Sequence, residues 1–213
     1  MIQSFNELPI GKYEQILKAI SDAGEIETEE AALDVQVQIV SILSGMTVDD
    51  VLHLPIDTYK DMARGVDFLT RVEGKILPLK DVYKYGKYEL VPVTDYRKLE
   101  TGQYIDFNSY ASGVEGENMV GLLSVILVPK GKRYNEGYDI IDLQNTLREE
   151  MTTSEAVSIC GFFVNLCRKS IRDSLTFSKR EARRLKDKEK GKEILNQIAQ
   201  VENSMKDGVG LKI

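Results

Sequence analysis

Few residues of this 213-residue chain are suited to catalysis or metal binding. His53 is its only histidine, and Cys160 and Cys167 are its only cysteines. A catalytic histidine works with a nucleophile and an orienting carboxylate, and a zinc site needs several nitrogen or sulfur ligands. One histidine and two cysteines in an apolar run do not supply either set. We therefore expect a protein that is not an enzyme and that holds no cofactor and no metal.

The surroundings of these residues have simpler explanations. Asp49, Asp50 and Asp57 lie near His53, but acidic residues are favoured at helix starts by capping and by the helix dipole. The cysteines are seven residues apart, which is about 10 Å along a helix, whereas a disulfide needs Cα atoms within about 7 Å. They should be free thiols packed in the core, in a reducing compartment.

The stretch PKGKRYNEGYD, residues 129–139, combines glycine with lysine as phosphate-binding loops do. It lacks the order G-x-x-x-x-G-K-[ST] and does not follow a clear strand. We interpret it as a polar loop between two helices, in which Gly131 and Gly137 form turns.

The strongest functional signal is a basic run from residue 168 to residue 192. Eleven basic residues there face four acidic ones, so the run carries +7, and the rest of the chain carries −13 of the total charge of −6. It could be a solvated helix, dock on an acidic surface of the same or a neighbouring copy, or neutralise phosphates. No aromatic residue follows Phe177, which argues against stacking on single-stranded nucleic acid. Docking ranks first and nucleic acid second.

Beyond the basic run, apolar residues recur at helical spacing and predict a helix that needs a partner surface. The predicted contact residues combine this apolar stripe with the basic residues before it: Lys179, Arg180, Arg183, Arg184, Lys186, Lys188, Ile194, Ile198, Val201 and Met205.

The N-terminal residues 9–69 read as short helices separated by breakers. Pro9 suits the first turn of the first helix, and a second helix runs from Thr28 to the breaker Gly45. Thr47 and Asp50 can form a capping box, and Asp57 is expected to cap the next helix, over residues 57–69.

From Lys75 to Val93 the pattern changes to short strands at 75–79, 81–85 and 88–93, with Gly86-Lys87 as a two-residue hairpin turn. Helices are then expected near 101–111, over 118–128 up to Pro129, and over 139–151. A second capping box, residues 152–155, should open a long apolar helix.

The predicted fold is α+β and predominantly α-helical, with a small inserted β-ribbon and a long basic C-terminal helix. The predicted parts are an N-terminal helical subdomain (1–74), the β-ribbon (75–93), a C-terminal helical core (94–176) and a basic amphipathic helical tail (177–213). The N-terminus lacks the pattern of a signal peptide, and the longest apolar run, Met119–Val128, is about half of a membrane span. We therefore expect a soluble intracellular protein with no membrane contact.

Two stretches resemble proteins of tailed bacteriophages. LSGMTVDDVLHLPIDTYKDMARGVDFL, within residues 40–69, is similar to a helical segment of small tail assembly chaperones. VILVPKGKRYNEGYD, leading into SEAVSICGFFVNL and ending at residue 166, resembles phage structural-module proteins. The β-ribbon and the basic tail go beyond a minimal chaperone.

This resemblance implies a non-enzymatic virion or assembly protein that acts through protein–protein contacts, such as a connector, ring or tail-associated subunit. The alternatives are a tail assembly chaperone that is absent from the mature particle, and a protein that contacts nucleic acid through residues 168–192. The implied partners are other phage structural proteins in a homo- or hetero-oligomer. The resemblance implies that the protein is in the host cytoplasm during assembly, and it allows a later location in the virion.

Overall fold

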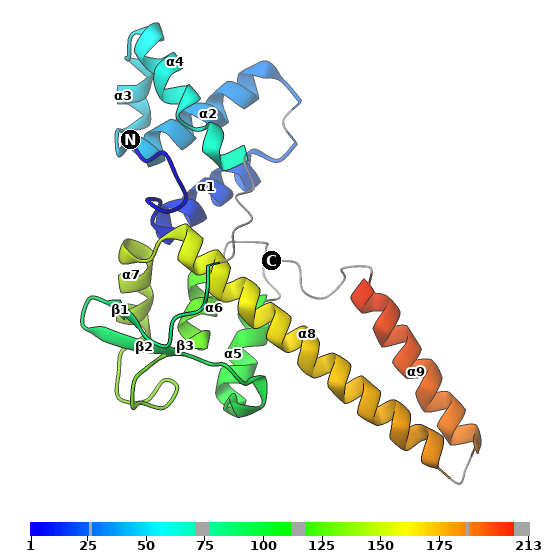
Figure 1. Cartoon of the computed structure of the whole chain (residues 1–213). Coiled ribbons are helices and arrows are strands. Elements are labelled where there is room, and N and C mark those ends of the chain that lie inside the picture. Colours follow the sequence, from blue (N-terminus) through cyan, green and yellow to red (C-terminus); the bar gives the residue numbers. More distant parts are fainter. Residues whose placement is uncertain (26, 71–76, 112–117, 186–187, 207–213) are drawn as a thin grey trace.

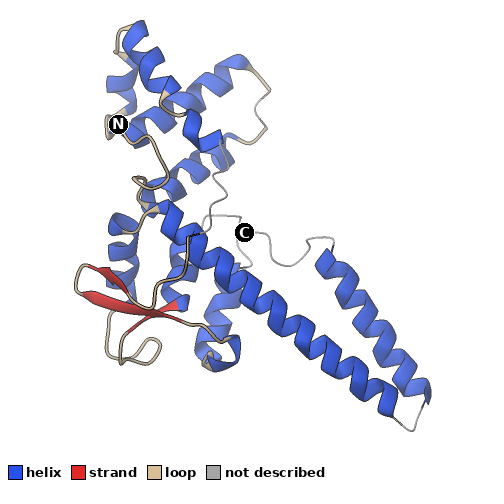
Figure 2. Cartoon of the chain, viewed as in Figure 1, coloured by secondary structure: helices blue, strands red, loops and turns tan. Residues whose placement is uncertain are grey.

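The structure is a computed structural model that describes residues 1–25, 27–70, 77–111, 118–185 and 188–206. It is an α+β fold in which helices predominate, as predicted from the sequence (Figures 1 and 2). Helices at one end form an N-terminal unit: α1 (Ile10–Ala23), α2 (Glu29–Ser44), α3 (Val48–Leu52) and α4 (Ile56–Arg64), then a 3-10 turn (Asp67–Thr70). The central body and a projecting pair of helices follow.

The ends of α2 and α3 confirm the predicted signals. The Thr28 side chain accepts a hydrogen bond from the Ala31 amide at the start of α2, and Gly45 ends that helix with a φ of 77°. Only glycine adopts this left-handed conformation without a steric cost from a Cβ atom. Thr47 and Asp50 form the predicted capping box, so α3 starts at a position that the sequence specifies.

The prediction for α4 was wrong at both ends. Pro55, with a φ of −55°, occupies the position before the helix, and Asp57 lies in the first turn instead of capping it. Proline loses nothing there because the first amides of a helix have no intrahelical partner. The helix ends at Arg64 rather than at Leu69. Gly65, the next residue, has a low helical propensity, and the chain then continues into the 3-10 turn.

The β-ribbon is part of a three-stranded antiparallel sheet, formed by β1 (Tyr83–Tyr85), β2 (Tyr88–Pro92) and β3 (Leu127–Pro129) in that order. The predicted hairpin turn at Gly86-Lys87 is confirmed by the pairing of Tyr85 with Tyr88. The predicted strand at 75–79 was wrong where the structure describes it, from Leu77 on. Pro78 cannot donate to a ladder, and the Leu77 amide bonds instead to Ser158 Oγ, at 2.9 Å.

The third strand was predicted as the end of an apolar helix. Helix α6 covers Met119–Ile126, and the chain then extends so that Val128 pairs with Val91 and Leu127 with Pro92. Pro129 disfavours a helical conformation in the residue before it, and β2 offers an unpaired edge. The sheet therefore joins the predicted β-ribbon to a third strand on the other side of α5 (Thr101–Ala111), which the sequence did not predict.

The main core lies between this sheet, α6, α7 (Ile140–Glu150) and the start of α8 (Thr153–Arg184). Every residue of α6 is buried. The largest fully buried residues of the main core include Leu90, Leu123, Leu143, Leu147 and Phe163. Smaller clusters in the N-terminal unit are built around α2, with Val35, Ile39 and Leu43 in one and Val37 and Val40 in another.

Hydrogen bonds hold the N-terminal unit to the body. The Ile10 amide donates to the Met151 carbonyl at 2.9 Å, and the Thr153 amide and hydroxyl both donate to the Leu8 carbonyl. Glu14 of α1 accepts a hydrogen bond from the Val120 amide of α6. The start of α1 and the start of α8 are thus fixed to each other.

The C-terminal part departs from the predicted division of the chain. Helix α8 is continuous through residue 177, where a boundary was expected, and it ends at Arg184. A second helix, α9 (Lys188–Lys206), runs back beside α8 (Figure 1). The predicted basic tail helix is therefore divided between the end of α8 and α9.

Candidate interaction surface

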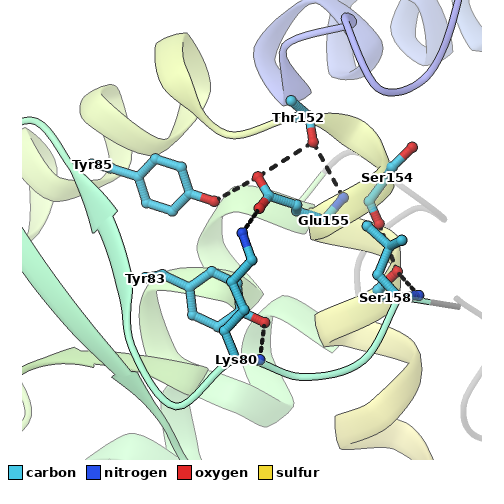
Figure 3. A network of polar contacts seen from close by, with 8 residues as sticks. Lys80, Tyr83, Tyr85, Thr152, Ser154, Glu155 and Ser158 are labelled. Atoms are coloured by element: carbon cyan, nitrogen blue, oxygen red, sulfur yellow. Dashed lines mark hydrogen bonds and ion pairs between the residues drawn. The ribbon is translucent and has the colours of Figure 1, made fainter.

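A polar network fixes the start of α8 and hence its direction (Figure 3). Thr152 Oγ1 accepts a hydrogen bond from the Glu155 amide at 3.4 Å, which is one of the two bonds of the predicted capping box. The Glu155 carboxylate accepts hydrogen bonds from Lys80 Nζ at 2.6 Å and from the Tyr85 hydroxyl at 2.9 Å. Ser158 donates to the Ser154 carbonyl and accepts from Leu77. This network ties α8 to the sheet.

Ionisation in this network follows from its contacts. Burial raises the pKa of the Glu155 carboxyl, but the hydrogen bonds from Lys80 and Tyr85 outweigh burial, so that the pKa lies below its usual value. Burial, followed by the hydrogen bond to Glu155, raises the pKa of Tyr85 above its ordinary range. Lys80 and Tyr85 thus hold the Glu155 carboxylate in its ionised form, and we interpret the three residues as a structural contact between α8 and the sheet.

The first half of α8 is buried in the body. Ile159, Cys160, Phe163 and Cys167 belong to the main core, and the Phe163 ring lies edge-on to Phe107 with centroids 5.1 Å apart. Burial raises the pKa of both thiols to about 12, so they remain protonated and apolar. They are free thiols, as predicted.

After Cys167 the helix leaves the body and forms, with α9, a projecting pair that we call the arm: residues 168–185 and 188–206 (Figure 1). A helix turns by about 100° per residue. On this basis the basic residues of α8 from Lys169 to Arg184 share one sector of about 140°. We call it the basic face; it consists of Lys169, Arg172, Lys179, Arg180, Arg183 and Arg184.

The basic face is open to solvent. Lys179 is half-buried and the other members are exposed. Arg184 pairs with Glu181 of the same helix at 3.0 Å. Within the described part of the chain, Arg172, Arg180 and Arg183 have no acidic partner. Arg172, Arg180 and Arg183 therefore give the face positive charge that no described acidic side chain balances.

The opposite side of the arm's α8 packs against α9. Ala182 of α8 and Ile198 of α9 are buried, at 4% and 6% exposure, and Leu175 and Ile194 are half-buried. For Ile194 and Ile198, the two residues of the predicted apolar stripe whose side chains the structure describes, α8 of the same chain therefore supplies a partner surface. Val201 and Met205 also belong to α9, but their side chains lie outside what the structure describes.

The remaining predicted contact residues divide between the two helices. Lys179, Arg180, Arg183 and Arg184 share the basic face, and Lys188 begins α9 as an exposed residue. Lys186 falls outside the described residues. Sequence reasoning did not select Arg172, which lies on the same face, although its spacing from Lys179 and Arg183 places it there.

Sequence reasoning also missed Phe177. Its side chain is 64% exposed, and it lies one turn before Arg180 beside the basic face. Leu185, at the tip of the arm, is exposed as well. Exposed aromatic and arginine side chains together are typical of residues that dominate binding to a protein partner.

The other candidate residues do not form a site. His53 is exposed at the end of α3, with Nδ1 2.7 Å from the Asp49 carbonyl, an ordinary helix-end contact. Among the described residues, no group of three or more histidine, cysteine, aspartate or glutamate side chains is placed to hold a metal ion.

Residues 129–139 connect β3 to α7, which corrects their predicted place between two helices. Gly131 and Gly137 form the predicted turns, each with a φ of 75°. This loop and the β1–β2 turn border an open hollow of about 710 Å³ that includes Lys87, Lys130 and Lys132. Lys87 and Lys130 already pair with Asp142 and Glu89.

Comparison with protein-family models, with curated proteins and with solved structures finds no match to this chain. None of the helices in the described ranges has both the length and the apolar character needed to cross a bilayer. The candidate site therefore rests on the geometry and charge of the arm.

Proposed function

We propose that this chain is a non-enzymatic bacteriophage virion or assembly protein that acts through protein–protein contacts, as a connector, ring or tail-associated subunit. One observation carries the proposal: the basic face lies on an arm that projects from an otherwise acidic chain (Figure 1). The bacteriophage setting is supported by the sequence resemblance over residues 40–69 and 126–166.

The arm is suited to docking for a physical reason. Charge concentrated on a projecting element steers an oppositely charged surface toward it and fixes the orientation of the encounter. Phe177 supplies apolar area beside Arg180 and Arg184, so that contact can also exclude water. A helix that served only to close the body would present polar groups of both signs instead.

A tail assembly chaperone is the alternative within the same class. It would use the same arm to hold an immature tail protein and would then dissociate. A virion subunit remains in purified particles, whereas a chaperone is absent from them, so mass spectrometry of purified particles separates the two.

Nucleic acid is a second candidate because the basic face could follow a phosphate backbone. Binding would then weaken steeply with salt, and a duplex would compete with an acidic protein partner. Fluorescence anisotropy with a labelled DNA duplex tests this directly. Binding at physiological salt that is lost on substitution of Arg180 and Arg183 would favour this candidate over protein docking.

The principal test is co-purification of the tagged full-length chain with the structural proteins that are encoded beside it. The wild type is expected to retain a partner that the triple variant Arg172→Ala, Arg180→Ala and Arg183→Ala loses. A matched control replaces three exposed lysines of the body, Lys98, Lys130 and Lys132. A partner retained equally by the arm variant would contradict the proposal, as would substrate turnover by the purified protein that His53→Ala abolishes.

A further inference from the structure

The same chain also contains a negatively charged region that complements the positive charge of the arm. Residues 21–70 of the N-terminal unit contain eleven acidic residues and two basic ones, a net charge of −9. This segment therefore holds most of the negative charge that balances the basic run at 168–192. The two charged regions belong to different ends of the fold.

The N-terminal unit also carries an exposed apolar surface. Leu52 at the end of α3 is 64% exposed, and Ile56 at the start of α4 is 62% exposed. Val48 is exposed one helical turn before Leu52, on the same side of α3. We call residues 48–57 the apex. Three bulky aliphatic side chains gathered at one corner of a charged unit are typical of an interaction site.

The apex is acidic around this apolar centre. Asp49, Asp50 and Asp57 lie within it, and the chain has no lysine or arginine between residues 21 and 59. Hydrogen bonds from the Thr47 side chain and then from its backbone lower the pKa of Asp50, which keeps that carboxyl ionised at the apex. The apex thus combines apolar area with negative charge, and the arm combines Phe177 and Leu185 with positive charge.

We infer that the arm of one copy docks on the apex of a second copy, in a head-to-tail contact. The inference rests on the proposed function and names the partner of the arm. In Figure 1 the α3–α4 corner and the tip of the arm lie at opposite ends of the molecule, so one chain cannot close this contact on itself. A contact between two different surfaces propagates, and it closes into a ring where the rotation between copies allows.

The hollow beside the sheet is a poor alternative receptor for the arm, because the carboxylates Glu89 and Asp142 already pair with Lys130 and Lys87 there. The α1–α2 corner is acidic too and exposes Ile20 and Leu33, but to a smaller extent than Leu52 and Ile56 are exposed. That corner offers a matched control within the same acidic unit.

The experiment measures the solution mass of the full-length protein by light scattering, at low and at high salt. The wild type is expected to form an assembly larger than the 24.0 kDa protomer that dissociates as salt rises. The apex variant Leu52→Lys with Ile56→Lys, and the arm variant Arg180→Glu with Arg183→Glu, should each associate at least about tenfold more weakly. Circular dichroism and thermal melting confirm that both variants fold.

The control variant, Ile20→Lys with Leu33→Lys, makes the same chemical change at the α1–α2 corner and should assemble like the wild type. Mixing the two deficient variants gives the sharpest result, because the arm variant keeps its apex and the apex variant keeps its arm. The mixture should form a 1:1 dimer of twice the protomer mass and nothing larger.

Other results overturn the inference. If the apex variant assembles normally while the arm variant does not, the arm binds another surface, and the proposed function stands without this partner. A wild type that is monomeric at low salt excludes a second copy as the partner. The co-purification test of the proposed function is independent of both results.

Discussion

The two halves of α8 place one continuous helix in two different environments. From Thr153 to Cys167 most of its side chains are buried or half-buried against the body, and Thr152 and Glu155 fix its first turn. From Lys169 to Arg184 it is covered on one side only, by α9, and the other side is the basic face. The first half holds the fold together, and the second half extends a charged surface away from it.

This difference shows what each half of the helix requires from its sequence. The first half needs residues of particular volume because a close-packed core tolerates few changes. The second half needs only a helix with one apolar and one basic side, which many sequences provide. Substitutions in the two halves should therefore differ in kind, with loss of stability in one and loss of binding in the other.

The largest effect is expected at Phe163, which is fully buried against Phe107. Phe163→Ala should lower the free energy of unfolding by about 3–5 kcal/mol, because it removes apolar burial and leaves a cavity. Phe177→Ala, in the exposed half, should change it by less than about 0.5 kcal/mol. Denaturant unfolding of both variants measures the contrast. Equal losses would mean that the arm is part of the cooperative core.

The next effect tests whether α9 opens on its own. Ile198 is buried in the arm and packs where α9 meets α8. Ile198→Ala should destabilise α9 by about 2 kcal/mol, at the low end for such a substitution because one helix alone covers the site. Hydrogen exchange should quicken in α9 and not in the main core. Gln197→Ala, at an exposed position of the same helix, is the control. Faster exchange throughout the protein would contradict independent opening.

A smaller effect is expected where α8 begins. Thr152→Ala removes the side chain that accepts from the Glu155 amide and should cost about 1 kcal/mol of stability. Thr176→Ala, in the exposed half, removes a hydroxyl that donates to the Arg172 carbonyl of its own helix, and should cost less. Thermal unfolding compares the two. A larger loss at Thr176 would reverse the assigned roles of the halves.

Lowering the pH should weaken the contacts of Glu155 at the start of α8. Because the pKa of Glu155 is lowered in the folded state, its contribution is present above the unfolded value of about 4.3 and is lost as the pH falls through the folded value. Glu155→Gln should therefore make stability fall less steeply between about pH 5 and pH 3. Burial raises the pKa of Glu14 above its usual value, so Glu14→Gln should act in the opposite direction. Urea unfolding at several pH values tests both signs.

Much of the fold could be predicted because local signals agreed with tertiary packing. Thr28, Gly45 and Thr47 set helix boundaries through short-range hydrogen bonds and backbone conformation, which a sequence carries directly. The third strand could not be predicted this way. Residues Leu127–Pro129 continue an apolar helical pattern, and their strand conformation depends on an edge of β2 that lies far away in the sequence.

The candidate site could likewise be predicted only in part. The basic run at 168–192 was visible as composition, and helical spacing arranges it as a face. That α9 folds back so that Ile194 and Ile198 face α8 could not be predicted, because the sequence of an amphipathic helix does not show whether its partner lies in the same chain. The exposure of Phe177 and Leu52 also depends on which surfaces the rest of the fold leaves uncovered.

The smallest effect on stability should accompany the largest effect on binding. Arg172 and Lys169 are like charges one helical turn apart on the basic face, an arrangement that costs an isolated helix about 0.2–0.5 kcal/mol. Arg172→Glu should therefore leave stability unchanged or raise it by about 0.3 kcal/mol, and this gain should vanish at high salt. Thermal melting at low and high salt measures it, with Arg172→Gln separating loss of charge from its reversal. If Arg172→Glu instead destabilised the arm and left partner binding intact, the basic face would be structural, and the contrast between the two halves of α8 would be lost.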